Sequence, residues 1–445
     1  MRVGLGPGQN QIEQERKRGR ALMGAEVRIT YQIESPLGLG PAASVIAGEQ
    51  SSGTFVPVPG ETEDLNARFR ARVLEVVSDG WQPEPSLPGT MRSGQGTGRV
   101  EIGQATLAFP LENFGVSLPN LLSTVAGNLF ELRELGGIRL VNIELPNEFA
   151  EKYPGPAFGP SGTRELTGAK EGALIGTIVK PSVGLPPDEL AKMVKDLCLA
   201  GLDFIKDDEL LGNPPYCPLA ERVEVIMRVI DDYAEKTGKR VMYAFNITDE
   251  PDQLQRNYEL VRARGGNCVM VCVAVVGFGT VAWLRNFSEL PIHGHRAMSG
   301  ALLRSPAIGM SPRVFQTLAR VAGVDQLHCG GIDSKFYEDN DSVVATVRAV
   351  REPLLSGYAC MPVLSSAQWA GTAERSFQLL GTDDLLVLAG GGIHSHPWGR
   401  KAGVESMRLA WDAARRGVPF EECAKEHAVV AAAVERFGGL GLRRA

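Results

Sequence analysis

From residue 172 onward, short apolar runs alternate with longer stretches whose apolar residues recur at helical spacing. The runs predict eight buried strands, at residues 173–180, 202–206, 240–247, 268–276, 290–296, 324–329, 359–364 and 384–390. Eight strand-then-helix units in about 240 residues match a (β/α)8 TIM barrel, an α/β fold. A doubly wound open sheet is the alternative, but it rarely has eight such units, and no GxGxxG motif follows the first strand.

The first 150 residues have a different pattern, with polar and apolar residues alternating as in half-buried strands. The pattern predicts strands at 25–34, 65–78, 98–110 and 137–146, with helices at 42–50 and 118–130. This arrangement predicts a small α+β domain of the ferredoxin-like kind. We therefore expect a flexible arm at 1–24, the α+β domain at 25–150, and the barrel with C-terminal helices at 151–445. The stretch 151–168 is rich in Pro and Gly and suits a boundary.

Composition narrows the class of protein. The chain has 445 residues, 44% hydrophobic and 22% charged, and a net charge of −6. No broad cationic field is present to hold nucleic acid. A membrane span needs about 18 consecutive apolar residues, and the sequence has no such run. The chain has seven cysteines and no CxxC pair, and its start lacks a secretory signal, so we expect a cytoplasmic location.

Polar residues end nearly every predicted barrel strand. Active sites of TIM barrels form at this end of the strands. Five of the six histidines lie there, and His427 is the exception. A single histidine at a strand end is more often structural, but the convergence of so many polar residues predicts a functional site. The residues are Lys180, Lys206 to Glu209, Asn246, His293, His295, Arg296, His328, Lys335, Ser365, Ser366, Gly390 to Gly392, His394 and His396.

Two of these segments indicate specific ligands. The run Lys206-Asp207-Asp208-Glu209 gathers carboxylates that are costly to hold together without a cation, and hard oxygen ligands suit Mg²⁺. A salt-bridged rim with Lys206 is the alternative. The glycines at 390–392 would leave backbone N–H groups free to bind phosphate, although a purely structural loop has the same composition. Arg296 could hold a second anionic group.

Six motifs in chain order resemble the large chain of ribulose-bisphosphate carboxylase (RuBisCO). They are GTIVKPSVGL, GLDFIKDDE, HGHRAM, LHCGGIDSK, MPVLSS and AGGGIHSHPWG, and EQSSGTF at 49–55 with Gly-Asn at 127–128 extends the match toward the N-terminus. The resemblance implies an N-terminal α+β domain followed by a TIM barrel. It also implies a homodimer, or a multiple of dimers, in which N-terminal residues of one chain complete the partner's site.

The resemblance also assigns roles in the chemistry. Lys206 is similar to the lysine that takes up CO₂ as a carbamate, and Asp208 and Glu209 to the other Mg²⁺ ligands. Lys180 resembles the lysine that abstracts the carbon-bound proton, and His295 the acid/base histidine of strand five.

The remaining matched residues would bind substrate. Arg296, His328 and Ser365 resemble one phosphate grip, and Thr54, Lys335, Gly390 and Gly391 the other. Asn128 resembles the partner-chain asparagine at the metal-bound substrate, and Glu49 the glutamate that holds the loop lysine.

The departures from the family pattern point away from carboxylation. Ser182 stands where carboxylases have the lysine that donates a late proton. Phe55, Ser299, Ala367 and Ile178 depart from the pattern as well. Similar losses are typical of RuBisCO-like proteins, which keep metal-assisted enolisation and use it on other substrates.

The leading hypothesis is therefore a Mg²⁺-dependent enzyme that enolises a phosphorylated keto-sugar or keto-sugar acid. Decarboxylation of a phosphorylated branched 3-oxo sugar acid is the first choice, because it needs an enolate but no added gas. The alternatives are an isomerase or enolase of the methylthioribulose-phosphate type, a true carboxylase, and a non-catalytic phosphate binder.

Overall fold

The computed structural model describes residues 24–53, 58–92, 98–355 and 357–439. The chain divides into two compact units, and each is described by itself. The first contains the described part of Met1–Lys152 together with Ala301–Phe315. The second contains Tyr153–Gly300 and the described part of Gln316–Ala445. The predicted arm, apart from Gly24, and Thr54 lie outside the described residues.

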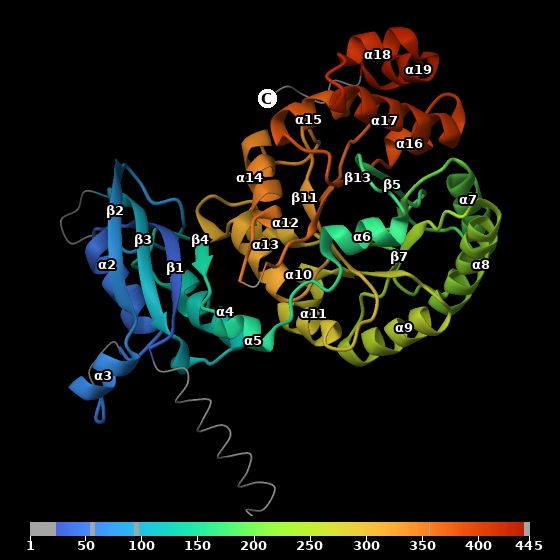
Figure 1. Cartoon of the computed structure of the whole chain (residues 1–445). Helices are drawn as coiled ribbons and strands as arrows, with labels where there is room; N and C mark the ends of the chain where they lie inside the picture. Colours follow the sequence, from blue (N-terminus) through green and yellow to red (C-terminus); the bar gives the residue numbers. More distant parts are fainter. Residues whose placement is uncertain (1–23, 54–57, 93–97, 356, 440–445) are drawn as a thin grey trace, which may run out of the picture. The chain divides into compact units, whose positions relative to one another are not determined.

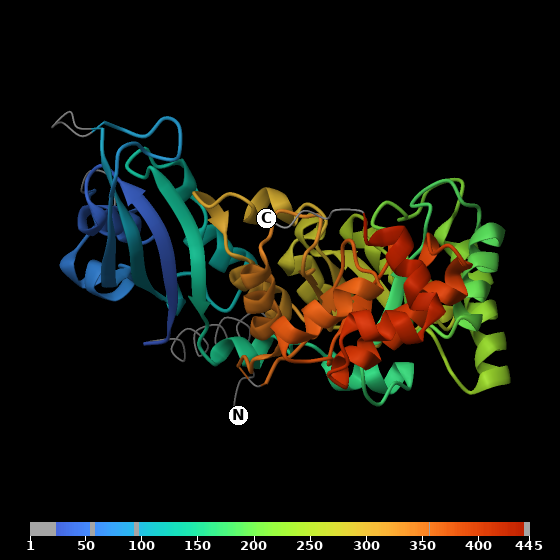
Figure 2. The same ribbon diagram turned by 90° about the horizontal axis from the view of Figure 1, so that it is seen from above.

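The first unit is built on a sheet of strand order β10-β4-β1-β3-β2 (Figures 1 and 2). Alternate side chains of β1 are buried, as expected for a sheet with one covered face, and the helix α2 packs against it. The elements are β1 Glu26–Ser35, α2 Leu39–Glu49, α3 Glu63–Phe69, β2 Arg72–Gln82, β3 Val100–Pro110, α4 Leu118–Val125, β4 Gly137–Glu144 and β10 Ile308–Met310. The antiparallel part has the βαββαβ order of ferredoxin-like folds.

Two features of this unit differ from the sequence prediction. The stretch 65–78 is a helix followed by a strand, because Thr62 caps α3 by accepting a hydrogen bond from the Leu65 N–H (3.2 Å). The strand β10 was not predicted. It pairs in parallel with β4, where Ile308 lies opposite Ile138, although it lies between two barrel strands in the sequence.

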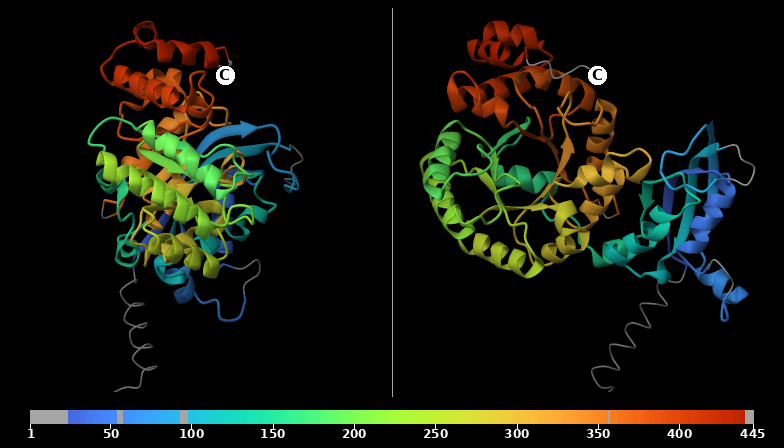
Figure 3. Two further views of the ribbon diagram at one scale, coloured as in Figure 1. Left: turned by 90° about the vertical axis from the view of Figure 1, so that its right-hand side faces the viewer. Right: turned by 180° about the vertical axis from the view of Figure 1, so that it is seen from behind.

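The second unit is a closed parallel barrel of eight strands with helices outside (Figures 1 and 3). The predicted TIM barrel is confirmed. Its strands are β5 Leu174–Ile178, β6 Phe204–Lys206, β7 Met242–Asn246, β8 Cys268–Cys272, β9 Ile292–His295, β11 Gln326–Gly330, β12 Met361–Leu364 and β13 Leu386–Leu388. The predicted run 268–276 ends early as a strand, because Val273–Val276 form the short helix α10.

Most helices of this unit follow the strands in sequence, but α6 precedes the first strand, β5, and α13 begins in the first unit. They are α6 Gly159–Thr167, α7 Pro187–Leu199, α8 Leu219–Thr237, α9 Pro251–Ala263, α11 Phe278–Arg285, α13 Pro312–Val321, α14 Asn340–Arg351, α15 Ala373–Leu380, α16 Gly391–His394, α17 Gly399–Arg415, α18 Phe420–Glu426 and α19 Ala428–Phe437. Among the described residues, no helix is long and apolar enough to cross a membrane.

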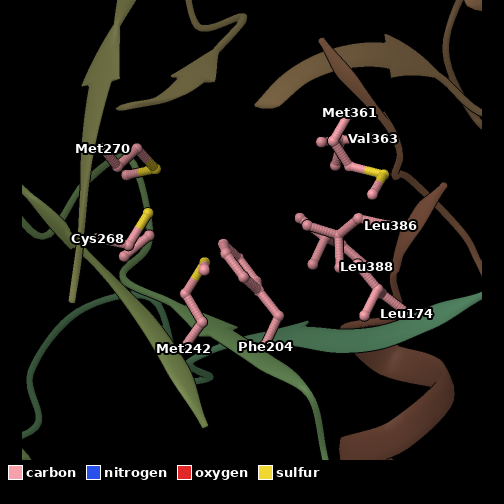
Figure 4. Close-up of a cluster of buried hydrophobic side chains, with 10 residues drawn as sticks. Leu174, Phe204, Met242, Cys268, Met270, Met361, Val363, Leu386 and Leu388 are labelled. Carbon is pink, nitrogen blue, oxygen red and sulfur yellow. The ribbon is translucent and has the colours of Figure 1, made fainter. Parts of the chain in front are cut away.

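Apolar side chains from the strands fill the middle of the barrel. In Figure 4, Cys268 and Met270 lie on one side of the barrel interior, Leu386 and Leu388 lie on the other, and Phe204 and Met242 lie between them. The barrel is thus a packed core and not a pore, as is usual for this fold. The labelled core residues are Leu174, Phe204, Met242, Cys268, Met270, Met361, Val363, Leu386 and Leu388.

Candidate active site at the carboxyl ends of the barrel strands

Lys206 is the last residue of β6 and is 1% exposed. Its Nζ donates a hydrogen bond to the carbonyl oxygen of Asp207 (2.8 Å) and lies 3.5 Å from Sδ of Met270. Burial lowers the pKa of Lys206, and the carboxylates nearby, chiefly Glu209 and Asp208, oppose that shift. The side chain is therefore an amine held out of water beside carboxylates.

Asp207 is fully buried, and its contacts give it a structural role. Its carboxylate accepts hydrogen bonds from the Tyr243 hydroxyl (2.6 Å) and the Asn246 backbone N–H (2.9 Å). It also lies 3.1 Å from Arg222, which is fully buried. Of the three carboxylates in the run, Asp208 and Glu209 are left for chemistry.

Asp208 and Glu209 are each paired with another predicted site residue. The Oδ2 atom of Asp208 lies 2.6 Å from Nζ of Lys180, which also donates to Oγ of Ser182 (2.6 Å). Oε2 of Glu209 lies 3.5 Å from Nε2 of His295. Burial by itself would raise the pKa of Asp208, but hydrogen bonds from Lys180 and the Leu210 N–H outweigh burial and lower it. The structure thus brings four of the predicted site residues together.

These residues fit a hard cation such as Mg²⁺ on the condition that a third oxygen ligand joins the two carboxylates. In the described part of the chain, no three His, Cys, Asp or Glu side chains converge as metal ligands. Asp208 and Glu209 offer two carboxylates, and their backbone is fixed because Nδ2 of Asn246 donates to both carbonyl oxygens (3.3 and 3.2 Å). A third oxygen ligand would have to come from Lys206 as a carbamate, which would convert its amine into an anionic donor of the kind that Mg²⁺ prefers.

The histidine side of the mouth is a buried hydrogen-bonded network. His293 and His328 are 2.9 Å apart through their Nε2 atoms, and Nδ1 of His328 lies 2.9 Å from Oγ of Ser365. Burial lowers the pKa of His293 to about 3 and places those of His295 and His328 well below the usual value. All three imidazoles are therefore neutral at pH 7.

Arg296, next to His295, is paired within the protein. Its Nη2 lies 2.6 Å from Oε2 of Glu338, whose side chain is 2% exposed. The remaining oxygen of Glu338 and Nη1 of Arg296 are buried and have no hydrogen-bond partner among the described residues. Glu338 was not identified from the sequence, because it is 42 positions from Arg296 and follows the loop lysine without a motif.

The glycine segment after β13 leaves room for a ligand. A side chain at Gly391 would meet no atom within 4 Å, and one at Gly390 would approach Lys180 at 3.9 Å. His394 holds this segment in place through its Nε2, 2.9 Å from the carbonyl oxygen of Ile178. His396 instead bonds to the carbonyl oxygen of Val429 in α19 and is structural.

Three more predicted site residues have no contact with these groups among the described interactions. Lys335 is exposed, with its Nζ 5.4 Å from the ring centre of Phe336. Glu49 and Asn128 are exposed in the first unit. The described contacts give these three residues no role in the cluster.

Comparison with known proteins identifies the family. Residues 24–149 match the N-terminal domain of the ribulose bisphosphate carboxylase large chain, and residues 159–437 match its catalytic domain. The chain is 46% identical to a 3-oxo-isoapionate-4-phosphate transcarboxylase/hydrolase of Xanthobacter autotrophicus over 90% of this chain and 96% of that protein. It is 44% identical to a 3-oxo-isoapionate-4-phosphate decarboxylase of Rhizobium rhizogenes over 92% and 98%.

A solved structure agrees with these sequence matches. The crystal structure of a rubisco-like protein from Burkholderia fungorum has a TM-score of 0.86 and 42% identity to this chain. It matches 92% of this chain and 99% of that one. The resemblance predicted from the six motifs is confirmed. The fold, the site at the barrel mouth and these matches together show that the chain belongs to the ribulose bisphosphate carboxylase large-chain family, among its RuBisCO-like members.

Proposed function

We propose that this protein is a Mg²⁺-dependent decarboxylase of a phosphorylated branched 3-oxo sugar acid. The observation that carries the proposal is the cluster of Lys180, Asp208, Glu209 and His295 around the buried Lys206. Two carboxylates, a lysine amine and a neutral imidazole suit proton transfer at a carbon next to a carbonyl. The relatives' names add a substrate with one phosphate, 3-oxo-isoapionate-4-phosphate.

In this proposal Asp208, Glu209 and carbamylated Lys206 would hold Mg²⁺. When bound, the cation would polarise the keto oxygen and lower the cost of negative charge on it. Loss of CO₂ breaks the bond between the carboxylate and the adjacent carbon, and the electron pair passes to the keto group as an enolate. Lys180 then donates a proton to that carbon, and His295 holds the substrate oxygens.

The other predicted residues bind the ends of the substrate. We assign the phosphate to Gly390 and Gly391, with Lys335 closing over it, and the family resemblance adds Thr54 to this group. Arg296, His328 and Ser365 hold the opposite end. The protein would act as a homodimer in which Asn128 and Glu49 serve the partner's site.

A second candidate is transcarboxylation followed by hydrolysis, favoured by the 46% identity to the Xanthobacter autotrophicus protein. It shares the loss of the carboxyl group but retains its carbon in a product. Ser182 disfavours true carboxylation of ribulose bisphosphate, because its hydroxyl, bonded to Lys180, has no amine to donate a proton.

The test uses 3-oxo-isoapionate 4-phosphate labelled with ¹³C in its carboxyl group, with Mg²⁺ and bicarbonate in D₂O. We expect labelled CO₂ and deuterium at the carbon next to the keto group. Label retained in a stable product instead supports transcarboxylation. We expect Lys206→Ala to abolish Mg²⁺-dependent turnover, and Lys180→Ala to lower kcat by about 10²–10⁴. Turnover that is insensitive to EDTA and to Lys206→Ala would refute the metal site.

A further inference from the structure

A continuous chain of hydrogen bonds runs from helix α6 through the barrel interior to the mouth. The hydroxyl of Thr163 bonds to the carbonyl oxygen of Gly159 (2.7 Å), and Nε2 of Gln326 bonds to Oγ1 of Thr163 (3.2 Å). Oε1 of Gln326 then lies 2.9 Å from Nδ1 of His293. From His293 the chain continues through His328 to Ser365 by the contacts described above.

The direction of every bond in this chain follows from its first member. Since Thr163 donates its hydrogen to a carbonyl oxygen, its Oγ1 must accept from the amide nitrogen of Gln326. The amide oxygen of Gln326 therefore faces His293, whose Nδ1 must carry a hydrogen. Nε2 of neutral His293 is then an acceptor, so Nε2 of His328 is the donor between the two rings.

At the end of this series of hydrogen bonds, the kind of ligand group that can bind to Ser365 is restricted. Nδ1 of neutral His328 carries no hydrogen, so the Ser365 hydroxyl donates to it. Ser365 is then left with lone pairs toward the mouth, and both ring nitrogens of His328 are occupied. A group placed beside Ser365 must therefore donate a hydrogen bond. A phosphate dianion has no hydrogen to donate, whereas a sugar hydroxyl does.

The charge at Arg296 is an independent indication that this part of the site does not bind a phosphate. The guanidinium already has a carboxylate at 2.6 Å, that of Glu338, in a region with almost no access to water. Gly330 makes this pair possible, because a side chain there would come within 3.1 Å of Oε2 of Glu338. The pair has no net charge, and a phosphate at Arg296 would be repelled by Glu338.

From these two observations we propose that Arg296, His328 and Ser365 recognise an uncharged, hydroxyl-bearing end of the substrate and not a second phosphate. Glu338 and Gln326 are then specificity-determining residues, and the site selects sugar phosphates that carry one phosphate. This inference adds the recognition of one end of the substrate to the proposed function, and it depends on that function only for the reaction that is catalysed. It replaces the expectation that this side of the mouth grips a phosphate.

The test is calorimetric binding of two ligands that differ by one phosphate, ribulose 5-phosphate and ribulose 1,5-bisphosphate, in Mg²⁺ and bicarbonate. We expect the monophosphate to bind at least about tenfold more tightly than the bisphosphate. This factor corresponds to the free-energy cost of one unsatisfied buried group. Ser365→Ala should weaken monophosphate binding alone, and Glu338→Gln should tighten bisphosphate binding. Equal or tighter bisphosphate binding by the native protein, or no gain in Glu338→Gln, would overturn the proposal.

Matched controls and a direct observation complete the test. Ser406→Ala removes another buried serine hydroxyl and Glu289→Gln another paired glutamate, and neither should change the ligand preference. Neutron diffraction should show deuterium on Nδ1 of His293 and Nε2 of His328. Deuterium on Nδ1 of His328 would mean that the hydrogen bonds run in the opposite direction, and it would refute the inference. This observation decides the question even if neither sugar phosphate binds. Neither readout needs turnover, so the proposed reaction can fail separately.

Discussion

His293 has no exposed surface, and both of its ring nitrogens are bonded to other side chains, Gln326 and His328. A positive charge on this ring would lack both water and a counterion. Burial therefore lowers the pKa of His293 to about 3, against about 6.5 in an unfolded chain. The folded protein excludes a proton that the unfolded chain binds at mildly acidic pH, so the residue links stability to pH.

We predict the sign and size of that link. Between about pH 6.5 and 3 the unfolded state binds the extra proton, so the free energy of unfolding falls as the pH falls. From pH 7 to pH 5 the contribution of His293 is about 2 kcal/mol. Urea unfolding at both pH values should show a smaller loss in His293→Gln than in the native protein. An equal loss in both, with the variant folded at pH 7, would contradict the prediction.

At the scale of elements, the Asp207–Arg222 pair joins β6 to α8, and Tyr243 and Asn246 tie it to β7. Asp207 directly precedes the carboxylates of the site in the sequence. Because both charges are buried, each one depends on the other for compensation. Three consecutive elements of the barrel thus hold Asp208 and Glu209 at the mouth.

We expect Arg222→Met to lower the free energy of unfolding by about 3–5 kcal/mol, since it leaves Asp207 charged and buried. Arg228→Met is the matched control on the same helix, where an exposed ion pair with Glu224 is worth at most about 1 kcal/mol. Denaturant titrations measure both values. Similar small losses in the two variants would show that Asp207 does not depend on Arg222.

The barrel elements were predictable because strands of a parallel barrel are buried on both faces and read as apolar runs. The strand β10 was not, because three residues, Ile308–Met310, give no periodicity and its partner β4 is far away in the sequence. The same reason hid Glu338 and Gln326. Their importance comes from contacts with Arg296 and His293, which no spacing along the chain reveals.

At the scale of the whole molecule, the predicted site residues are divided between the two units. Glu49 and Asn128 are exposed in the first unit, and the ionic cluster belongs to the second. The family resemblance implies that Glu49 and Asn128, the residues of the first unit, serve a partner's site. Closed twofold symmetry would give each dimer two such sites.

The prediction is complementation between two inactive variants. Asn128→Ala and Lys206→Ala should each lack activity alone, because one loses the asparagine at the substrate and the other the metal site. After exchange of subunits, half of the dimers are mixed and each has one intact site, so about a quarter of native activity should return. Mass spectrometry confirms the exchange. No recovery after confirmed exchange would mean that each chain builds its site alone.

The position of β10 has a consequence for how the protein is made. Five barrel strands, β5 to β9, precede β10 in the sequence. A ribosome adding about 5–20 residues per second would therefore need on the order of ten seconds to travel from β4 to β10. Throughout that time β4 is the edge of an incomplete sheet, with unpaired backbone groups open to other chains. The nascent protein would need protection most during this interval, before the barrel that carries the chemistry can close.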